Sequence, residues 1–178
     1  MALCEIYSYS CESIGALSST AIAAFAFFAT AYQAWSTRKH NRLSVKPMLT
    51  TLAVCPDNGY IVKLSNIGIG PALIKSFEIY ADDKKIDGTG FEPITKAVHI
   101  MFPQDSPEIL NWGYLSPGGA MAASSSIDIV NLLFSPTSLP SAALLEHFQK
   151  RIKLVIKYTS IYEEEVFIYD SYKSHITP

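Results

Sequence analysis

Residues 14–35 read IGALSSTAIAAFAFFATAYQAW, and this stretch decides how the chain is organised. It lies inside an uncharged run that extends from residue 13 to residue 37. As an α-helix the stretch is about 33 Å long at about 1.5 Å per residue, and the hydrocarbon core of a bilayer is about 30 Å thick. Tyr32 and Trp35 stand at its end, where amphipathic rings favour the headgroup region. The stretch therefore predicts one transmembrane helix.

Basic residues follow the uncharged run and predict its orientation. They are Arg38, Lys39, Arg42 and Lys46. The segment before the run contains Glu5 and Glu12 and no Lys or Arg. By the positive-inside rule, the first residues are expected to lie outside the membrane and the rest of the chain in the cytoplasm. The expected parts are an extracytoplasmic segment over 1–12, a transmembrane helix over 13–37, a basic juxtamembrane linker over 38–47 and a cytoplasmic domain over 48–178.

Two other interpretations of residues 14–35 compete with a membrane anchor. Ala29-Thr30-Ala31 resembles the cleavage site of a signal peptide. However, a signal peptide needs a positive N-terminal region, which is missing, and the basic cluster opposes export. A buried core helix seldom runs this far without a charge. The anchor is the favoured interpretation.

The predicted helix has two different faces. Aromatic side chains recur at spacings of three and four on the side expected to contact lipid: Phe25, Phe28, Tyr32 and Trp35. Small or weakly polar residues lie opposite: Gly15, Ser19, Ala23, Ala26, Thr30 and Gln33. Small residues let helices approach closely in lipid, and hydroxyl and amide groups hydrogen-bond across the contact. The pattern predicts a homo-oligomer with this face toward a partner helix or a narrow pore, although an alanine-rich anchor also carries such a pattern without packing.

Charge and cysteine content restrict what the remaining domain does. After Lys46 the acidic residues outnumber the basic ones, so no non-specific nucleic-acid binding is expected. The basic linker is instead expected to meet anionic lipid headgroups. Cys55 is the only cysteine of the domain, which excludes a disulfide framework within it and fits a reducing compartment.

Alternating apolar residues and turn signals predict that the domain is mainly β. Pro56-Asp57-Asn58-Gly59 is a hairpin signal, because Asn-Gly supplies positive φ angles. Residues 139–150 predict the one amphipathic helix, with Ser141 as its cap, and residues 103–119 read as a loop with one short helix at most. Seven strands are expected, over 48–55, 60–66, 73–81, 97–102, 124–131, 151–158 and 166–172, and a short segment over 84–86 follows the Asp82-Asp83 turn. Short strands at this spacing predict an antiparallel sandwich.

No catalytic or metal-binding motif is present in the sequence. The four histidines are scattered without the spacing of metal ligands. Gly68-Ile69-Gly70 lacks the third glycine of a dinucleotide site, and no nucleophile motif occurs. We therefore expect no enzyme activity, no metal and no cofactor.

Two further segments resemble a known family. They are Asn66-Ile67-Gly68-Ile69-Gly70-Pro71-Ala72 and Tyr158-Thr159-Ser160-Ile161-Tyr162. With Lys46-Pro47 and Leu115-Ser116-Pro117-Gly118, the chain resembles small bacterial single-pass inner-membrane proteins with a cytoplasmic immunoglobulin-like β-sandwich. The second segment departs from the family pattern, which has an acidic residue and a glycine where Ser160 and Glu163 stand here.

The resemblance implies a function that composition and spacing do not show. Some members of the family resemble membrane effectors of anti-phage defence, which are controlled by a nucleotide or oligonucleotide signal or by an operon-encoded partner protein. It implies an oligomeric effector, a gated channel or a membrane-disrupting protein. The loop with Asn66, Gly68 and Gly70 is a weak candidate for ligand binding, against a purely structural turn. The alternative function is a membrane-anchored scaffold that recruits a soluble partner.

Overall fold

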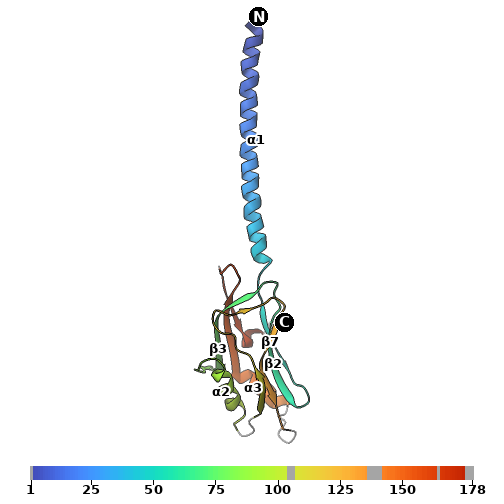
Figure 1. The fold of residues 1–178 in the computed structure, drawn as a ribbon, viewed down its shortest axis with the longest axis vertical. Helices are drawn as coiled ribbons and strands as arrows, with labels where there is room; N and C mark the ends of the chain where they lie inside the picture. Colours follow the sequence, from blue (N-terminus) through green and yellow to red (C-terminus); the bar gives the residue numbers. More distant parts are fainter. Residues whose placement is uncertain (1, 104–106, 136–141, 164, 175–178) are drawn as a thin grey trace. The chain divides into compact units, whose positions relative to one another are not determined.

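The computed structural model describes residues 2–103, 107–135, 142–163 and 165–174 (Figure 1). It divides into two compact units, Met1–Leu43 and Ser44–Pro178. The first unit is a helix, and all the strands and the remaining helices belong to the second.

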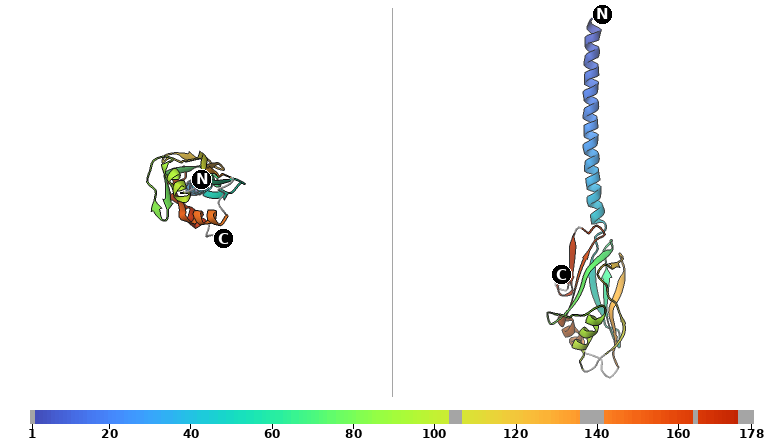
Figure 2. Two further views of the ribbon diagram at one scale, coloured as in Figure 1. Left: turned by 90° about the horizontal axis from the view of Figure 1, so that it is seen from below. Right: turned by 60° about the vertical axis from the view of Figure 1, so that its left-hand side comes forward.

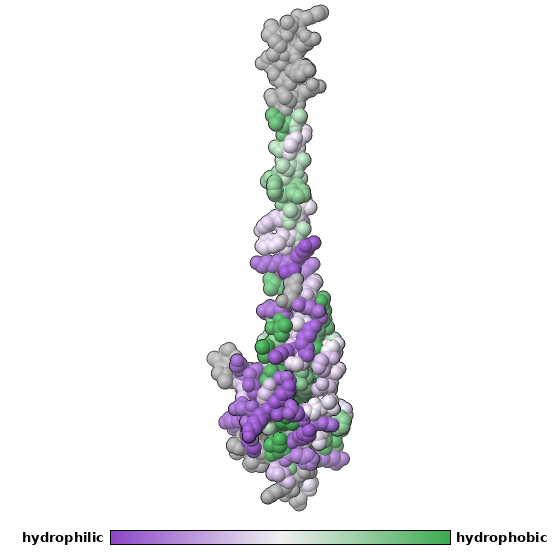
Figure 3. Space-filling view, turned by 90° about the vertical axis from the view of Figure 1, so that its left-hand side faces the viewer, coloured by the Kyte–Doolittle hydropathy of each residue, from purple (hydrophilic) through white to green (hydrophobic). Residues whose placement is uncertain are grey.

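The first unit is one long helix, α1 (Ala2–Leu43). Every residue from Gly15 to Leu43 is exposed, and this part is long and apolar enough to cross a membrane. Figure 3 shows its apolar band giving way to a hydrophilic band at the basic residues. The segment over 38–47 was expected to be a linker, but α1 continues through it as far as Leu43. The residues from Arg38 to Leu43 include no proline or glycine, so nothing in the sequence ends the helix earlier.

The second unit contains two antiparallel β-sheets. The first sheet has the order β1-β2-β7-β5 and the second β4-β3-β8-β9, with β6 also pairing with β3. The strands of the first sheet are β1 (Leu49–Val54), β2 (Gly59–Asn66), β7 (Ser126–Leu133) and β5 (Glu108–Trp112). Those of the second are β4 (Lys84–Lys85), β3 (Ala72–Ala81), β8 (Ile152–Thr159), β9 (Val166–Asp170) and β6 (Ala120–Met121).

The core of this unit lies between the two sheets. Leu64 and Leu132 of the first sheet and Ile74 and Ile156 of the second are completely buried. Each comes from a strand in which inward apolar residues alternate with more exposed ones, as a strand with one buried face requires. The expected antiparallel β-sandwich is confirmed.

Helices cover the end of the sandwich that lies away from residues 44–48. They are α2 (Glu92–Met101) and α3 (Ala142–Arg151), which lie side by side in both views of Figure 2. A one-turn helix, α4 (Ser171–Ser174), follows β9. The predicted helix over 139–150 is thus confirmed from residue 142 onward, whereas its predicted cap, Ser141, lies outside the described residues.

The prediction of a strand over 97–102 is wrong, because α2 occupies these residues. Its buried side chains are Ile94, Ala97, Val98 and Met101, which follow the helical spacing of three and four. Pro93 stands at the start of the helix, where its missing N–H costs nothing. The run of β-branched and apolar residues at the end of α2 is also typical of a strand, which explains the wrong prediction.

Two smaller predictions also need correction. The expected loop over 103–119 contains β5, an edge strand between Pro107 and Gly113. Pro107 and Gly113 flank this short strand and made the segment read as a loop. The strand pairs with β7 on one side only. The last predicted strand stops at Asp170 instead of Tyr172, because the Asp170 carboxylate accepts a hydrogen bond from the Tyr172 N–H and starts α4.

Candidate functional site

The aromatic face of α1 is entirely exposed. Phe25, Phe28, Tyr32 and Trp35 are between 59% and 76% exposed, and the rings of Tyr32 and Trp35 lie 6.1 Å apart. At about 100° per residue these four positions occupy an arc whose centre lies about 160° from that of the small-residue face. Phe27 lies between the two faces and packs edge-on against Phe28. Such a surface contacts water only at a large cost in free energy, which favours a lipid surrounding.

The small-residue face of α1 carries Gly15, Ser19, Ala23, Ala26, Thr30 and Gln33. The hydroxyl of Ser19 donates to the carbonyl oxygen of Gly15 at 2.7 Å, and that of Thr30 donates to Ala26 at 2.7 Å. The hydroxyl protons are therefore satisfied inside the helix, and only the oxygens can accept a hydrogen bond from another helix. The face is smooth, and a Cβ added at Gly15 would meet no atom within 4 Å.

The basic residues are divided between helix and linker. Arg38, Lys39 and Arg42 belong to the last turns of α1, where cations are favoured by the helix dipole. The Lys39 ammonium lies 5.5 Å from the centre of the Trp35 ring. Lys46 belongs to the second unit, where its ammonium lies 4.9 Å from the Phe167 ring of β9.

Asn66 joins three segments of the sandwich in the loop that the sequence singled out. The residue is 1% exposed. Its Oδ1 accepts from the backbone N–H groups of Met48 and Gly68, both at 3.1 Å. Its Nδ2 donates to the carbonyl oxygens of Gly70 at 2.9 Å, Ala122 at 3.1 Å and Met121 at 3.3 Å. Because both ends of this amide are engaged within the protein, the side chain is held as a structural tie.

The two glycines of this loop give room to the chain that enters the sandwich. A Cβ added at Gly70 would lie 1.8 Å from the carbonyl oxygen of Val45, and one at Gly68 would lie 2.4 Å from the Met48 nitrogen. Pro47 is fully buried between them. We call residues 45–48 the entry segment. Asn66, Gly68 and Gly70 therefore hold the entry segment against the sandwich, and their role in ligand binding stays a prediction.

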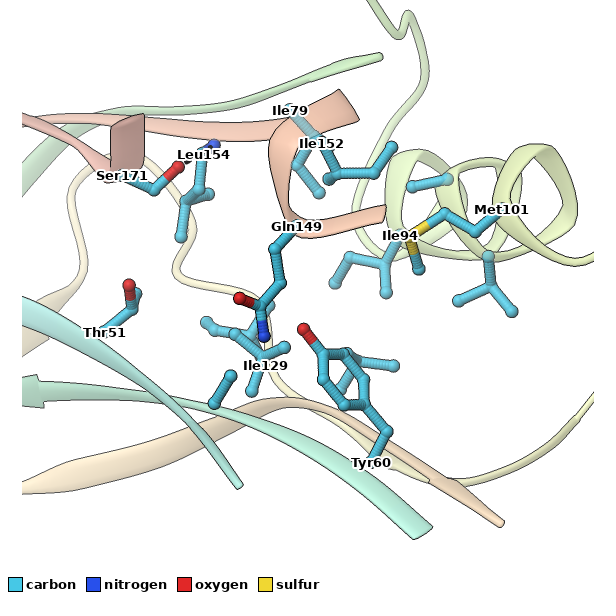
Figure 4. Close-up of a pocket in the computed structure, with 15 residues that line it drawn as sticks. Thr51, Tyr60, Ile79, Ile94, Met101, Ile129, Gln149, Ile152, Leu154 and Ser171 are labelled. Atoms are coloured by element: carbon cyan, nitrogen blue, oxygen red, sulfur yellow. Dashed lines mark hydrogen bonds between the residues drawn. The ribbon is translucent and has the colours of Figure 1, made fainter. Parts of the chain in front are cut away.

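A cavity of about 120 Å³ lies between the sheets, beneath α2 and α3 (Figure 4). Its wall is mostly apolar, with Ile94, Ile129, Ile152 and Leu154 among the lining residues. The Tyr60 hydroxyl and the Gln149 amide face each other inside it. Burial raises the pKa of Tyr60, and its hydrogen bond with Gln149 partly offsets that rise. Ligand pockets usually measure about 300 Å³ or more, so this cavity suits a small apolar group and not a nucleotide.

A second concave surface carries three lysines and one aspartate, Asp82, and nothing in the sequence indicated it. It measures about 590 Å³, and its lining includes the residues that we call the basic hollow: Lys84, Lys85, Lys96 and His99. The Lys85 ammonium pairs with Glu78 at 2.8 Å, and that of Lys96 donates to the Asp87 carbonyl at 2.7 Å. These residues come from β4 and α2, whose meeting point could not be foreseen while α2 read as a strand.

The described residues contain no group of three His, Cys, Asp or Glu side chains that could hold a metal ion. Cys55 is exposed and has a free thiol. Comparison of the chain with protein-family models, with curated proteins and with solved structures finds no match.

Proposed function

We propose that this protein is an oligomeric effector of a bacterial inner membrane. In this proposal α1 spans the membrane with its first residues outside, and the sandwich lies in the cytoplasm. The helices associate through the small-residue face and form a channel or a bundle that disturbs the membrane. The observation that carries the proposal is an entirely exposed apolar helix with aromatic residues on one face and small residues on the other.

The entry segment supports a link between the sandwich and the helix. Only Ser44 separates the last helical residue, Leu43, from residues that Asn66 and the two glycines hold in place. A short, restrained connection transmits a change in the sandwich better than a long flexible linker does. A ligand shifts the assembly only as far as its affinities for the two states differ.

The basic hollow is the surface whose charge suits a nucleotide or oligonucleotide signal. Phosphate groups are bound by Lys side chains, and here three of them line one concave surface. Control by such a signal, or by an operon-encoded partner protein in anti-phage defence, is the part of the proposal that comes from family resemblance. Lys84→Glu with Lys96→Glu would remove the response to a phosphate-bearing signal, and the sequence of α1 would stay unchanged.

The test compares two double variants in lipid vesicles. Ser19→Leu with Ala23→Leu changes the small-residue face, and Phe25→Leu with Phe28→Leu changes the opposite face at similar hydrophobicity. The first pair should lower the crosslinked oligomer fraction and the release of trapped dye by about tenfold, equivalent to about 1.4 kcal/mol of helix association. The second pair should retain both. A monomeric wild-type protein that releases no dye would refute the proposal.

The second candidate function is a membrane-anchored scaffold, and one observation favours it. Phe91 and Trp112 are 47% and 46% exposed, and their rings stack at 4.7 Å. Exposed aromatic residues are enriched where proteins bind one another. A scaffold would keep its soluble partner after deletion of residues 1–37, and Trp112→Ala would abolish that binding. An effector would instead lose its effect on the membrane after the same deletion.

A further inference from the structure

Apolar side chains are exposed at the end of the sandwich that holds the entry segment. They are between 43% and 77% exposed, and we call them the entry-end patch: Met48, Ile67, Ile69, Ile161, Tyr162 and Val166. Ile67 and Ile69 alternate with the two glycines of the loop after β2. Ile161 and Tyr162 lie in the turn between β8 and β9, whose tip lies at this end in Figure 1.

Several contacts place these loops together. The Ile67 N–H donates to the Met48 carbonyl oxygen at 2.8 Å, so this loop lies against the entry segment. Leu73 pairs with Thr159, so the loop before β3 and the turn after β8 leave the second sheet at the same end. The contact of Lys46 with Phe167 brings the start of β9 to the entry segment.

The patch is apolar where loops are ordinarily polar. Turns favour Gly, Asn, Asp and Ser, yet this loop presents two isoleucines, one of them 77% exposed. The Asn66 hydrogen bonds, and the close contact of Gly68 and Gly70 with the entry segment, fix the loop backbone. The Ile69 side chain is therefore held at the surface. A rigid loop that displays large aliphatic side chains indicates a surface that is covered in the working protein.

The connection to α1 limits what covers the patch. Ser44, Val45 and Lys46 lie between the helix and buried Pro47, and three residues span at most about 11 Å. The helix from Trp35 to Leu43 adds about 12 Å beyond the apolar stretch. Headgroups extend about 5–8 Å beyond the hydrocarbon core, so the helix end and these three residues keep the patch within about 18 Å of them. Lys46, beside the patch, carries the charge that anionic headgroups attract.

We propose that the entry-end patch inserts into the headgroup region of the bilayer that α1 crosses, so that the sandwich rests on the membrane by its loops. This inference depends on the membrane insertion of α1 in the proposed function. Amphipathic surfaces of this kind bind at the boundary between headgroups and acyl chains, with aliphatic and aromatic side chains inserted and cations at the anionic surface.

The test uses one environment-sensitive fluorophore at one cysteine of the full chain. Cys4→Ala with Cys11→Ala leaves Cys55, which is exposed one residue beyond the far end of β1 and serves as the matched control. With Cys55→Ala added, Ile69→Cys and Ile161→Cys place the label in the patch. Ala21→Cys places it in α1. Each protein is inserted into vesicles of brominated phosphatidylcholine and phosphatidylglycerol, after circular dichroism confirms its fold.

Labels at positions 69 and 161 should be quenched at least about twofold more strongly than the label at Cys55, and less strongly than the label at position 21. Vesicles without phosphatidylglycerol should weaken the quenching at position 69 and not at position 21. If position 21 is quenched while 69 and 161 match Cys55, the inference is overturned and the proposed function remains. If the label at position 21 is not quenched, α1 is not inserted in the membrane, and both the inference and the proposed function are refuted.

Discussion

At the scale of single residues, Asn66 explains why the loop after β2 has its sequence. An asparagine was needed because the site requires both an acceptor for two N–H groups and a donor to carbonyl oxygens. The sequence indicated a special turn here, since Asn, two glycines and a proline follow one another. It did not reveal what the turn holds, because Met48, Met121 and Ala122 are distant in the chain.

Replacement of Asn66 by Asp tests this account. The carboxylate keeps the acceptor for Met48 and Gly68 but removes the donor, and it places a charge beside the Gly70 carbonyl oxygen in a buried site. The free energy of unfolding should fall by about 3 kcal/mol in urea titrations. Asn111→Ala, at an exposed position, should change it by less than about 0.5 kcal/mol. Equal effects of the two substitutions would contradict the role of Asn66.

The buried tyrosines predict how stability depends on alkaline pH. Burial raises the pKa of Tyr60 and Tyr158 above the ordinary value of 10.0. The unfolded chain therefore loses these protons first, so the contribution of the two tyrosines to stability is constant below about pH 10 and is lost as pH rises through the folded-state pKa. Tyr60→Phe should make this fall shallower in urea titrations from about pH 8 to about pH 11. A slope unchanged by Tyr60→Phe would show that Tyr60 ionises equally in both states.

At the scale of elements, α2 and β5 show where sequence patterns mislead. Alternation and helical spacing cannot be distinguished in a run as short as Ala97 to Phe102, and packing against β3 decides the outcome. The longer strands β1, β2, β3, β7, β8 and β9 were predictable because a sandwich buries one face of each, so that apolar residues recur with a period of two in the sequence. The two-residue strand β6 was not predicted. The basic hollow depended on α2 and was missed for that reason.

The packing of α2 gives a prediction with a matched control. Ile94 is 3% exposed and lines the cavity between the sheets, whereas Ile100 of the same helix is 41% exposed. Ile94→Ala should lower the free energy of unfolding by about 3 kcal/mol, because it removes buried methyl groups and enlarges the cavity. Ile100→Ala should lower it by less than about 1 kcal/mol. Chemical denaturation of both variants measures the difference, and similar values would mean that α2 packs differently.

At the scale of the whole molecule, the helix and the sandwich divide their tasks. Among the residues whose burial the structure describes, those of the hydrophobic core lie between Leu49 and Tyr169, and none of them belongs to α1. The sequence predicted this division from the uncharged run alone. It could not predict the restrained entry segment, because that restraint consists of contacts between distant residues.

A chain that begins at Ser44 should therefore fold without the helix. It should be monomeric and soluble, and its cooperative unfolding transition should keep the midpoint of the full chain to within a few degrees, since no core contact is lost. Differential scanning calorimetry and near-ultraviolet circular dichroism check this. A broad transition, or aggregation at low concentration, would show that α1 contributes to the fold of the sandwich.

The entry segment also bears on the rotational position of the small-residue face about the axis of α1. Because residues 45–48 are fixed to the sandwich and α1 is continuous to Leu43, only Ser44 lies between the two, and the length of α1 sets the angular phase of the small-residue face relative to the last helical residue. Inserting one alanine before Leu43 would change that phase by about 100°, whereas inserting seven would nearly restore it. In an assembly built on this helix, the number of residues between the face and Ser44 would thus set the side on which each chain leaves its helix.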